Sequence, residues 1–164
     1  LNVLAADSLL ERVLLLDLPA VLELELAPGQ LRYAALVGAD GAGNVDLALG
    51  REHFVLAPRD LERLWTRRTI YLWNNYKSLP ALEPGMSGSA VRGVRARLTA
   101  LGFLSPGDPS GEYDVLTIDA VRASQRARAL DVTGNVDPAT LIALYQALDY
   151  DTPRLSGPAS GGES

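Results

Sequence analysis

In the first half of the chain, short apolar runs alternate with turn residues. Leu22, Leu24 and Leu26 alternate with Glu23 and Glu25, which is the pattern of a strand with one buried and one solvated face. Similar patterns predict strands over residues 21–26, 31–37, 45–49, 53–56 and 69–73. The strand over residues 31–37 is expected to be interior, because it is continuously apolar after Arg32. Residues 1–76 are therefore expected to form a small antiparallel β-rich unit.

Two short helices are expected within this unit. One covers residues 7–16, with Asp7 or Ser8 as its N-cap, and the other runs from Pro58 to about Trp65. Trp65 and Trp73 are expected in the core, because the unit holds few other large side chains.

The second half has helical spacing. Val91, Val94, Leu98 and Leu101 recur every three or four residues and predict a helix over 89–101, capped by Ser87 and ended by Gly102. Further helices are expected over 115–129 and 138–148. The sequence thus indicates an α+β fold, with a connector over 77–84, a three-helix domain over 85–150 and a disordered tail over 151–164.

A turn that leads into a helix occurs twice. Gly, an apolar residue, Asp and Thr recur at matching offsets, first as Gly111, Tyr113, Asp114 and Thr117, then as Gly134, Val136, Asp137 and Thr140. Each Asp is expected to cap the following helix by accepting its free N–H groups. The alternative, a glycosidase pair formed by Asp114 and Asp137, is disfavoured by these matching cap positions.

Composition excludes several classes of function. The 164 residues carry a net charge of −5, which disfavours nucleic acid and anionic membranes as partners. No apolar run approaches the about 20 residues that cross a bilayer. The chain begins with Leu1 and shows no signal peptide, so it is expected to be a piece of a longer protein. Cysteine is absent, so thiol catalysis and disulfides are excluded.

Few residues are candidates for catalysis or ligand binding. His53 is the one histidine and is interpreted as structural, because no carboxylate stands at a useful spacing. No metal-ligand cluster or cofactor motif is visible, and no enzyme is expected. Tyr113 either plugs the core or exposes its ring to a sugar. Four arginines lie at helical spacings: Arg92, Arg95, Arg122 and Arg126. They either bind the carboxylates of a stem peptide or form a solvated helix face.

Residues 82–148 resemble the three-helix peptidoglycan-binding domain found beside many cell-wall hydrolases. The sequence departs from that family at Ser124, Thr133 and Asp137, where Phe, Asp and Gly are common. The matching positions are Pro84-Gly85, Gly88, Val91, Leu98, Leu101-Gly102-Phe103-Leu104, Gly111, Tyr113, Thr117, Ala120-Val121, Gln125, Leu130, Gly134, Val136 and Pro138-Ala139-Thr140-Leu141.

The first half is similar to the later half of C39-like papain-type peptidases. The resemblance lies in Pro19-Ala20-Val21, in residues 32–38, in Leu61 to Trp65 and in Tyr71-Leu72-Trp73. Arg32 stands where that family has its catalytic histidine, and the nucleophilic cysteine is absent. Here a degenerate half of this kind precedes a peptidoglycan-binding domain. This order of domains resembles the periplasmic regions of the family of general secretion pathway A proteins, which help place the type II secretin in the cell wall.

These resemblances imply a periplasmic, non-catalytic region of an inner-membrane-anchored protein. Its partners would be peptidoglycan and a type II secretion protein or the secretin, with no cofactor, metal or membrane contact of its own. A protein-docking scaffold that has lost its ligand, or an accessory domain of a wall hydrolase, are the alternatives. The expected peptidoglycan-binding residues are Tyr113, Asp114, Thr117, Arg92, Arg122 and Gln125.

Overall fold

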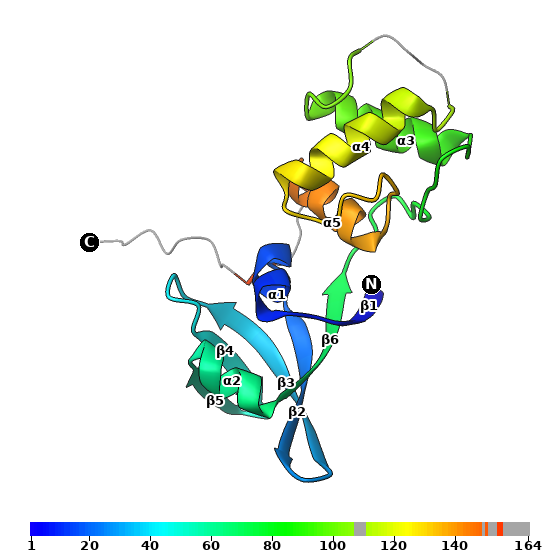
Figure 1. The fold of residues 1–164 in the computed structure, drawn as a ribbon. Helices are drawn as coiled ribbons and strands as arrows, with labels where there is room; N and C mark the ends of the chain where they lie inside the picture. The colour runs from blue at the N-terminus through cyan, green and yellow to red at the C-terminus, as the bar shows by residue number, and fades with distance from the viewer. Residues whose placement is uncertain (107–110, 149, 151–153, 156–164) are drawn as a thin grey trace. The chain divides into compact units, whose positions relative to one another are not determined.

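The computed structural model describes residues 1–106, 111–148, 150 and 154–155. These form two compact units (Figure 1). The sheet unit contains Leu1–Asn74 and the described residues 154 and 155, and the helical unit contains Asn75–Thr152. The fold is α+β, as predicted.

The described part of the sheet unit holds a six-stranded antiparallel sheet with the order β1-β6-β2-β3-β4-β5. The two terminal strands of the sheet are β1 and β5. The strand bounds are β1 Asn2–Asp7, β2 Ala20–Ala27, β3 Gln30–Ala39, β4 Val45–Leu49, β5 Glu52–Leu56 and β6 Trp65–Trp73. Five of these follow the expected apolar runs, and β3 is interior as predicted.

Strand β1 was not expected, and it corrects the prediction for the first helix. Helix α1 (Leu10–Leu16) has Leu9 as its N-cap residue, without a side-chain cap. Asp7 ends β1, where it pairs with Arg68 of β6. Ser8 is buried, and its Oγ accepts a hydrogen bond from Tyr71 Oη at 2.9 Å. Asp7 and Ser8 therefore contact strand β6 of the sheet and do not cap α1.

The sheet-unit core combines alternating strand residues with the inner faces of two helices. Helix α2 (Pro58–Leu64) begins at Pro58 as predicted and buries Leu61. Trp65 and Trp73 are buried, as expected. The described residues of the predicted tail also reach this unit, because the backbone N–H of Leu155 donates to the carbonyl of Asp17 at 3.2 Å and its side chain is buried.

Helices α3 (Ser89–Ala100), α4 (Val115–Ala127) and α5 (Pro138–Ala147) match the expected helices of the second half. The predicted cap of α3 is wrong. Gly88 is the N-cap, with a φ of 118° and no side-chain cap, whereas Ser87 forms a β-bridge with Glu112. Gly102 follows α3 with a φ of 78° and donates to the carbonyl of Thr99, as expected for a helix end.

The segment before α3 joins both repeated turns by backbone hydrogen bonds. Leu82 and Val136 exchange two such bonds, at 3.0 and 2.8 Å. Tyr113 donates its N–H to the carbonyl of Met86 at 2.8 Å, and Gly111 accepts from Gly88 at 2.8 Å. Residues 82–88, read from sequence as connector and helix cap, thus anchor the two turns in one small domain.

Candidate functional site

A buried arginine organises the first repeated turn. Arg95 of α3 is 3% exposed. Its Nη1 donates to Asp114 Oδ1 at 2.9 Å, to the carbonyl of Glu112 at 3.4 Å and to the hydroxyl of Thr117. Arg95 therefore ties the turn to α3, and it does not belong to a solvated helix face.

Gln125 does the same for the second turn. From α4, its Nε2 donates to the carbonyl of Asn135 at 2.9 Å and to Thr140 Oγ1 at 3.1 Å. Its Oε1 accepts from the N–H of Gly134 at 3.0 Å. Asn135 and Thr140 are the repeat counterparts of Glu112 and Thr117. The repeat thus includes the preceding helix, because Arg95 and Gln125 hold equivalent atoms from positions thirty residues apart.

Arginines cover both repeated glycines. A Cβ at Gly111 would lie 2.7 Å from Arg92 Nη1, and a Cβ at Gly134 would lie 3.1 Å from Arg122 Nε. Arg92 and Arg122 are also thirty residues apart, and both remain exposed. The missing side chain at each glycine makes room for an arginine on the domain surface.

Both aspartates cap helices. Asp114 Oδ1 accepts from the N–H of Thr117 at 2.8 Å, and Asp137 Oδ1 accepts from the N–H of Thr140 at 2.7 Å. The hydrogen bonds from Thr117, together with nearby Arg95, lower the pKa of Asp114 below its usual value. The predicted capping role is confirmed.

Three residues of the expected binding set are buried in the frame of the domain. Tyr113 is 2% exposed and donates its hydroxyl to the carbonyl of Gly134 at 2.7 Å, and burial raises its pKa. Thr117 and Gln125 are also buried. Tyr113 is a core plug, so the alternative of a ring exposed to a sugar is wrong for this structure. The exposed members of the set are Arg92 and Arg122, while Asp114 is half-buried.

An open groove of the helical unit lies beside the first repeated turn, where the sequence led us to expect one, but most of its lining residues were not foreseen. It has a volume of about 540 Å³ and lies between the chain after α3 and the first turns of α4. One wall is formed by residues 103–106, and α4 contributes Leu116, Asp119 and Ala120, with Arg95 also in the lining. The exposed apolar Leu116 beside the cap Asp114 was the available signal.

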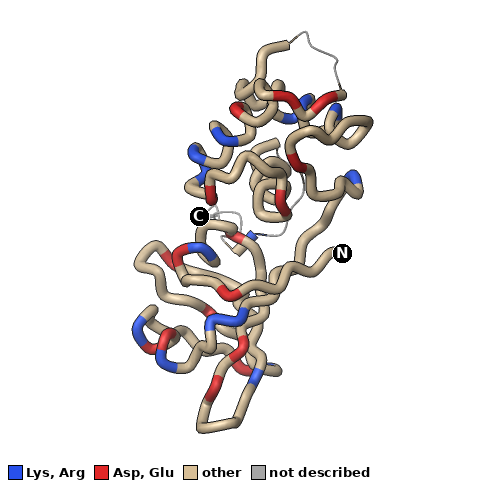
Figure 2. The backbone as a smooth tube through the Cα atoms, turned by 45° about the vertical axis from the view of Figure 1, so that its right-hand side comes forward, with Lys and Arg blue, Asp and Glu red and all other residues tan. Residues whose placement is uncertain are grey.

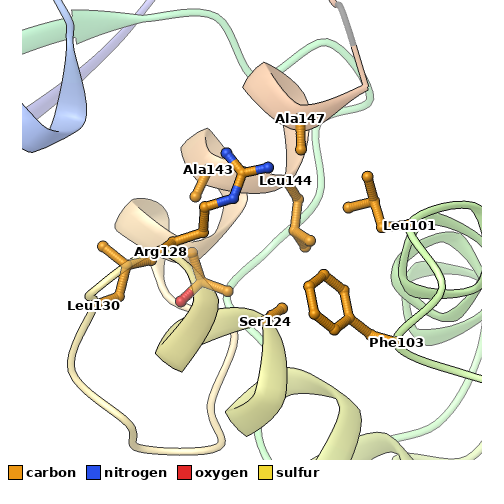
Figure 3. Close-up of a pocket in the computed structure, with 9 residues that line it drawn as sticks. Leu101, Phe103, Ser124, Arg128, Leu130, Ala143, Leu144 and Ala147 are labelled. Atoms are coloured by element: carbon orange, nitrogen blue, oxygen red, sulfur yellow. The ribbon is translucent and has the colours of Figure 1, made fainter.

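A small void marks the departure at Ser124. Its volume is about 10 Å³, close to that of one water molecule. Figure 3 shows the ring of Phe103 directed toward Ser124 and Leu144. Phe103 thus occupies space beside Ser124, and little core volume is lost at this departure from the expected phenylalanine.

The sheet unit contains one histidine–carboxylate pair. His53 Nδ1 lies 3.1 Å from Asp46 Oδ1 across the β4–β5 hairpin, and both side chains are partly exposed. The expectation that no carboxylate stands at a useful spacing from His53 is therefore wrong, because the hairpin pairs His53 with Ala48 and so places Asp46 diagonally across from it on the same face. Arg32 donates to the carbonyl of Leu31 at 2.9 Å. Among the described residues, no group of three or more His, Cys, Asp or Glu could hold a metal ion.

Acidic and basic residues are interspersed in both units (Figure 2). In the helical unit, exposed Arg122 and Asp119 approach to 3.7 Å, three residues apart on α4. Within the described residues, no helix has both the length and the apolarity needed to cross a membrane.

Residues 87–144 match the family model described as "Putative peptidoglycan binding domain". This stretch of the chain is similar to that family. The match covers α3 and α4 and most of α5, together with both repeated turns. The two repeated turns, their helix caps and the buried residues Arg95 and Gln125 all lie within the matched stretch.

Two further proteins are similar to parts of the chain. N-acetylmuramoyl-L-alanine amidase CwlL of Bacillus licheniformis is 41% identical over 64 residues, which are 38% of this chain and 18% of the amidase. The fold resembles the crystal structure of a periplasmic domain of the EpsAB fusion protein of the Vibrio vulnificus type II secretion system, with a TM-score of 0.51 and 22% identity. That likeness covers 87% of this chain and 63% of the solved chain.

Proposed function

We propose that the chain is a non-catalytic peptidoglycan-binding region and that its helical unit carries the binding site. The observation behind this proposal is that the family match over residues 87–144 falls within one compact unit that has an open groove of about 540 Å³. Grooves of roughly 300–1,000 Å³ are typical of small-ligand sites. A disaccharide or a short stem peptide is a ligand of suitable size.

The groove has the chemistry that wall fragments require. Phe103, Leu104 and Leu116 offer apolar surface for sugar ring faces, acetyl methyl groups or alanine side chains. Ser105 and Asp119 offer hydrogen-bonding groups at the same groove. Buried Arg95 bonds to Asp114 in the turn that precedes α4. It therefore fixes the start of α4, which carries Leu116.

Arg92 and Arg122 are proposed to add local positive charge. An acidic chain gains little from general attraction to the carboxylates of the wall, so local donors on a shaped surface must supply the recognition. Both guanidinium groups lie over repeated glycines and remain exposed. Asp114, Thr117, Tyr113 and Gln125 are assigned to positioning in this proposal, because their polar atoms are engaged within the domain.

The absence of catalysis is also a proposal. The sequence has no cysteine, and Arg32 stands where C39-like peptidases have a histidine. The His53–Asp46 pair supplies a base and a group that orients it, but covalent catalysis also requires a nucleophile within reach of the base. Incubation of the chain with sacculi should release no soluble fragments, and His53→Ala should leave that result unchanged. Fragment release that depends on His53 would contradict this part of the proposal.

The resemblance to the EpsAB domain supports a narrower role in type II secretion. The likeness covers 87% of this chain, so it includes residues of both units. We propose a periplasmic region that helps place the secretin in the cell wall. In the source organism, variants that lose peptidoglycan binding should lower the amount of assembled secretin multimer at an unchanged level of secretin monomer. Normal multimer levels in such variants would contradict the proposed role in secretion but not the proposed binding to peptidoglycan.

Sedimentation with insoluble sacculi tests the binding role. The whole chain should enter the pellet, and Arg122→Ala should lower the retained fraction. Arg63→Ala is a matched control, because Arg63 and Asp60 form a similar exposed pair three residues apart in the sheet unit, at 3.9 Å. Equal losses with both variants would indicate a general charge effect. A chain that stays in the supernatant at every concentration would favour the alternative of a protein-docking scaffold.

A further inference from the structure

The sheet unit carries a wholly apolar pocket with no role in the proposed peptidoglycan site. Its volume is about 210 Å³. It is lined by residues of β2, β3, β4 and β5 and by the last residue of α2: Leu24, Leu26, Ala34, Leu47, Leu49, Phe54, Leu56 and Leu64. A pocket lined only by apolar side chains offers no hydrogen bonds to water. It therefore favours a bulky apolar group as its occupant.

The pocket adjoins the free edge of the sheet. Strand β5 pairs with β4 on one side, and no described strand pairs with its other side. Most of β5 is exposed, including Phe54, which lines the pocket, and Val55, which is 70% exposed. A terminal strand with apolar exposed residues is a template for another strand.

The hairpin geometry identifies which backbone groups of β5 face outward. Gly50 and Arg51 form a two-residue turn, and Leu49 pairs with Glu52 on either side of it. That closing pair is hydrogen-bonded in hairpins of this kind, and hydrogen-bonded and non-hydrogen-bonded pairs then alternate along the strand. His53 and Val55 therefore direct their N–H and C=O groups to the free edge.

From these two features we infer that β5 and the apolar pocket form a docking site for an extended segment of a partner protein. The segment adds a strand beside β5 through the backbone groups of His53 and Val55. Side chains alternate between faces along a strand, so one bulky apolar side chain of the segment reaches the pocket face that carries Phe54. The free edge favours a peptide over an isolated apolar molecule, since such a molecule would leave the outward backbone groups unused.

Peptides selected on the intact chain test this inference. A displayed library of random 12-residue peptides is the probe, and the selected sequences are synthesised and their affinity is measured. Selected peptides should show alternating apolar residues with at least one aromatic or branched member. Failure of the library to enrich such peptides would overturn the inference.

Two matched pairs of variants locate the site. Val55→Pro removes an outward N–H without disturbing the β4 pairing, and it should weaken peptide binding about tenfold or more. Val55→Ala keeps the N–H and should change binding less than about twofold. Ala34→Leu fills the pocket and should also weaken binding, whereas Ala48→Leu, on the opposite face of β4, should not. Thermal unfolding checks that each variant is folded.

Two results would assign the surface to another occupant and overturn the inference. One is a dimer of this chain that sedimentation detects and that Val55→Pro abolishes. The other is pocket-dependent binding of an apolar dye, lost in Ala34→Leu, with no peptide binding. Peptide affinity that is insensitive to both Val55→Pro and Ala34→Leu would also contradict it.

Discussion

The hydroxyl of Tyr113 donates a 2.7 Å hydrogen bond to the carbonyl of Gly134, so the core plug of the first turn is bonded to the glycine of the second. Both groups are buried. The two copies of the repeat are therefore joined through a polar contact in the interior of the helical unit. Loss of one partner of a buried hydrogen bond is costly, because the remaining polar group cannot form a hydrogen bond with water instead.

Tyr113→Phe is predicted to destabilise the chain by about 1–3 kcal/mol, because it leaves the carbonyl of Gly134 without this donor. Tyr33→Phe is the matched control. Tyr33 is 55% exposed and donates to Glu23 Oε2 at 2.9 Å, so removal of its hydroxyl should destabilise the chain less than Tyr113→Phe does. Urea denaturation of both variants makes the comparison. Equal effects would show that the Tyr113–Gly134 contact contributes no more than a surface hydrogen bond.

The two caps should differ in strength. Asp137→Ala is predicted to cost about 0.5–2 kcal/mol, the usual value of an N-cap. Asp114→Ala should cost about 1.5–3 kcal/mol more, because Asp114 also accepts a hydrogen bond from buried Arg95, and bonds between charged groups are stronger. Denaturant titration of both variants tests this order. A larger loss at Asp137 would contradict the assigned role of Arg95.

Asp114 should make stability depend on pH in the acid range. Its pKa is lowered in the folded state, with the hydrogen bonds from Thr117 as the largest cause. The resulting stabilisation is present above the unfolded pKa of about 3.9 and is lost as the pH falls through the lower folded value. Asp114→Asn should therefore flatten the loss of stability below about pH 4. An unchanged acid limb of the stability profile would show that Asp114 does not contribute to it.

The packing around Ser124 predicts a coupled pair. Ser124→Phe should destabilise the helical unit by about 1–3 kcal/mol, because the void of about 10 Å³ cannot hold a ring. Phe103 fills the neighbouring space, so Ser124→Phe should be better tolerated when it is combined with Phe103→Ala. The double-mutant cycle should give a favourable coupling of about 0.5–3 kcal/mol. Additive effects would mean that the two side chains do not compete for one space.

The sequence predicted elements whose signals are local. Alternation located β2, β4 and β5, Pro58 marked the start of α2, and the repeated Gly–Asp–Thr pattern gave the caps of α4 and α5. Strand β1 was missed because its short apolar run gains its partner from β6, more than sixty residues away. Ser8 and Ser87 were wrongly expected to cap helices, because each is used in tertiary contacts that local propensity does not encode.

The candidate site was less predictable than the fold. The residue types at Tyr113, Thr117 and Gln125 suit both ligand binding and internal hydrogen bonding, and the choice depends on burial. The equivalence of Arg95 and Gln125 was hidden because an arginine and a glutamine do not look like a repeat. The groove depends on how residues 103–106 lie beside α4, which no spacing in the sequence reports.

The most direct test of the central claim compares two neighbouring substitutions on α4. Leu116 is 61% exposed and lines the groove, while Val115 is 69% exposed and is rotated by about 100° around the helix. The measurement is the retention of the whole chain on sacculi as a function of protein concentration. Leu116→Glu should weaken retention about tenfold or more, equivalent to about 1.4 kcal/mol, and Val115→Glu should leave it nearly unchanged. Equal retention of the two variants would contradict the proposal that this groove binds peptidoglycan.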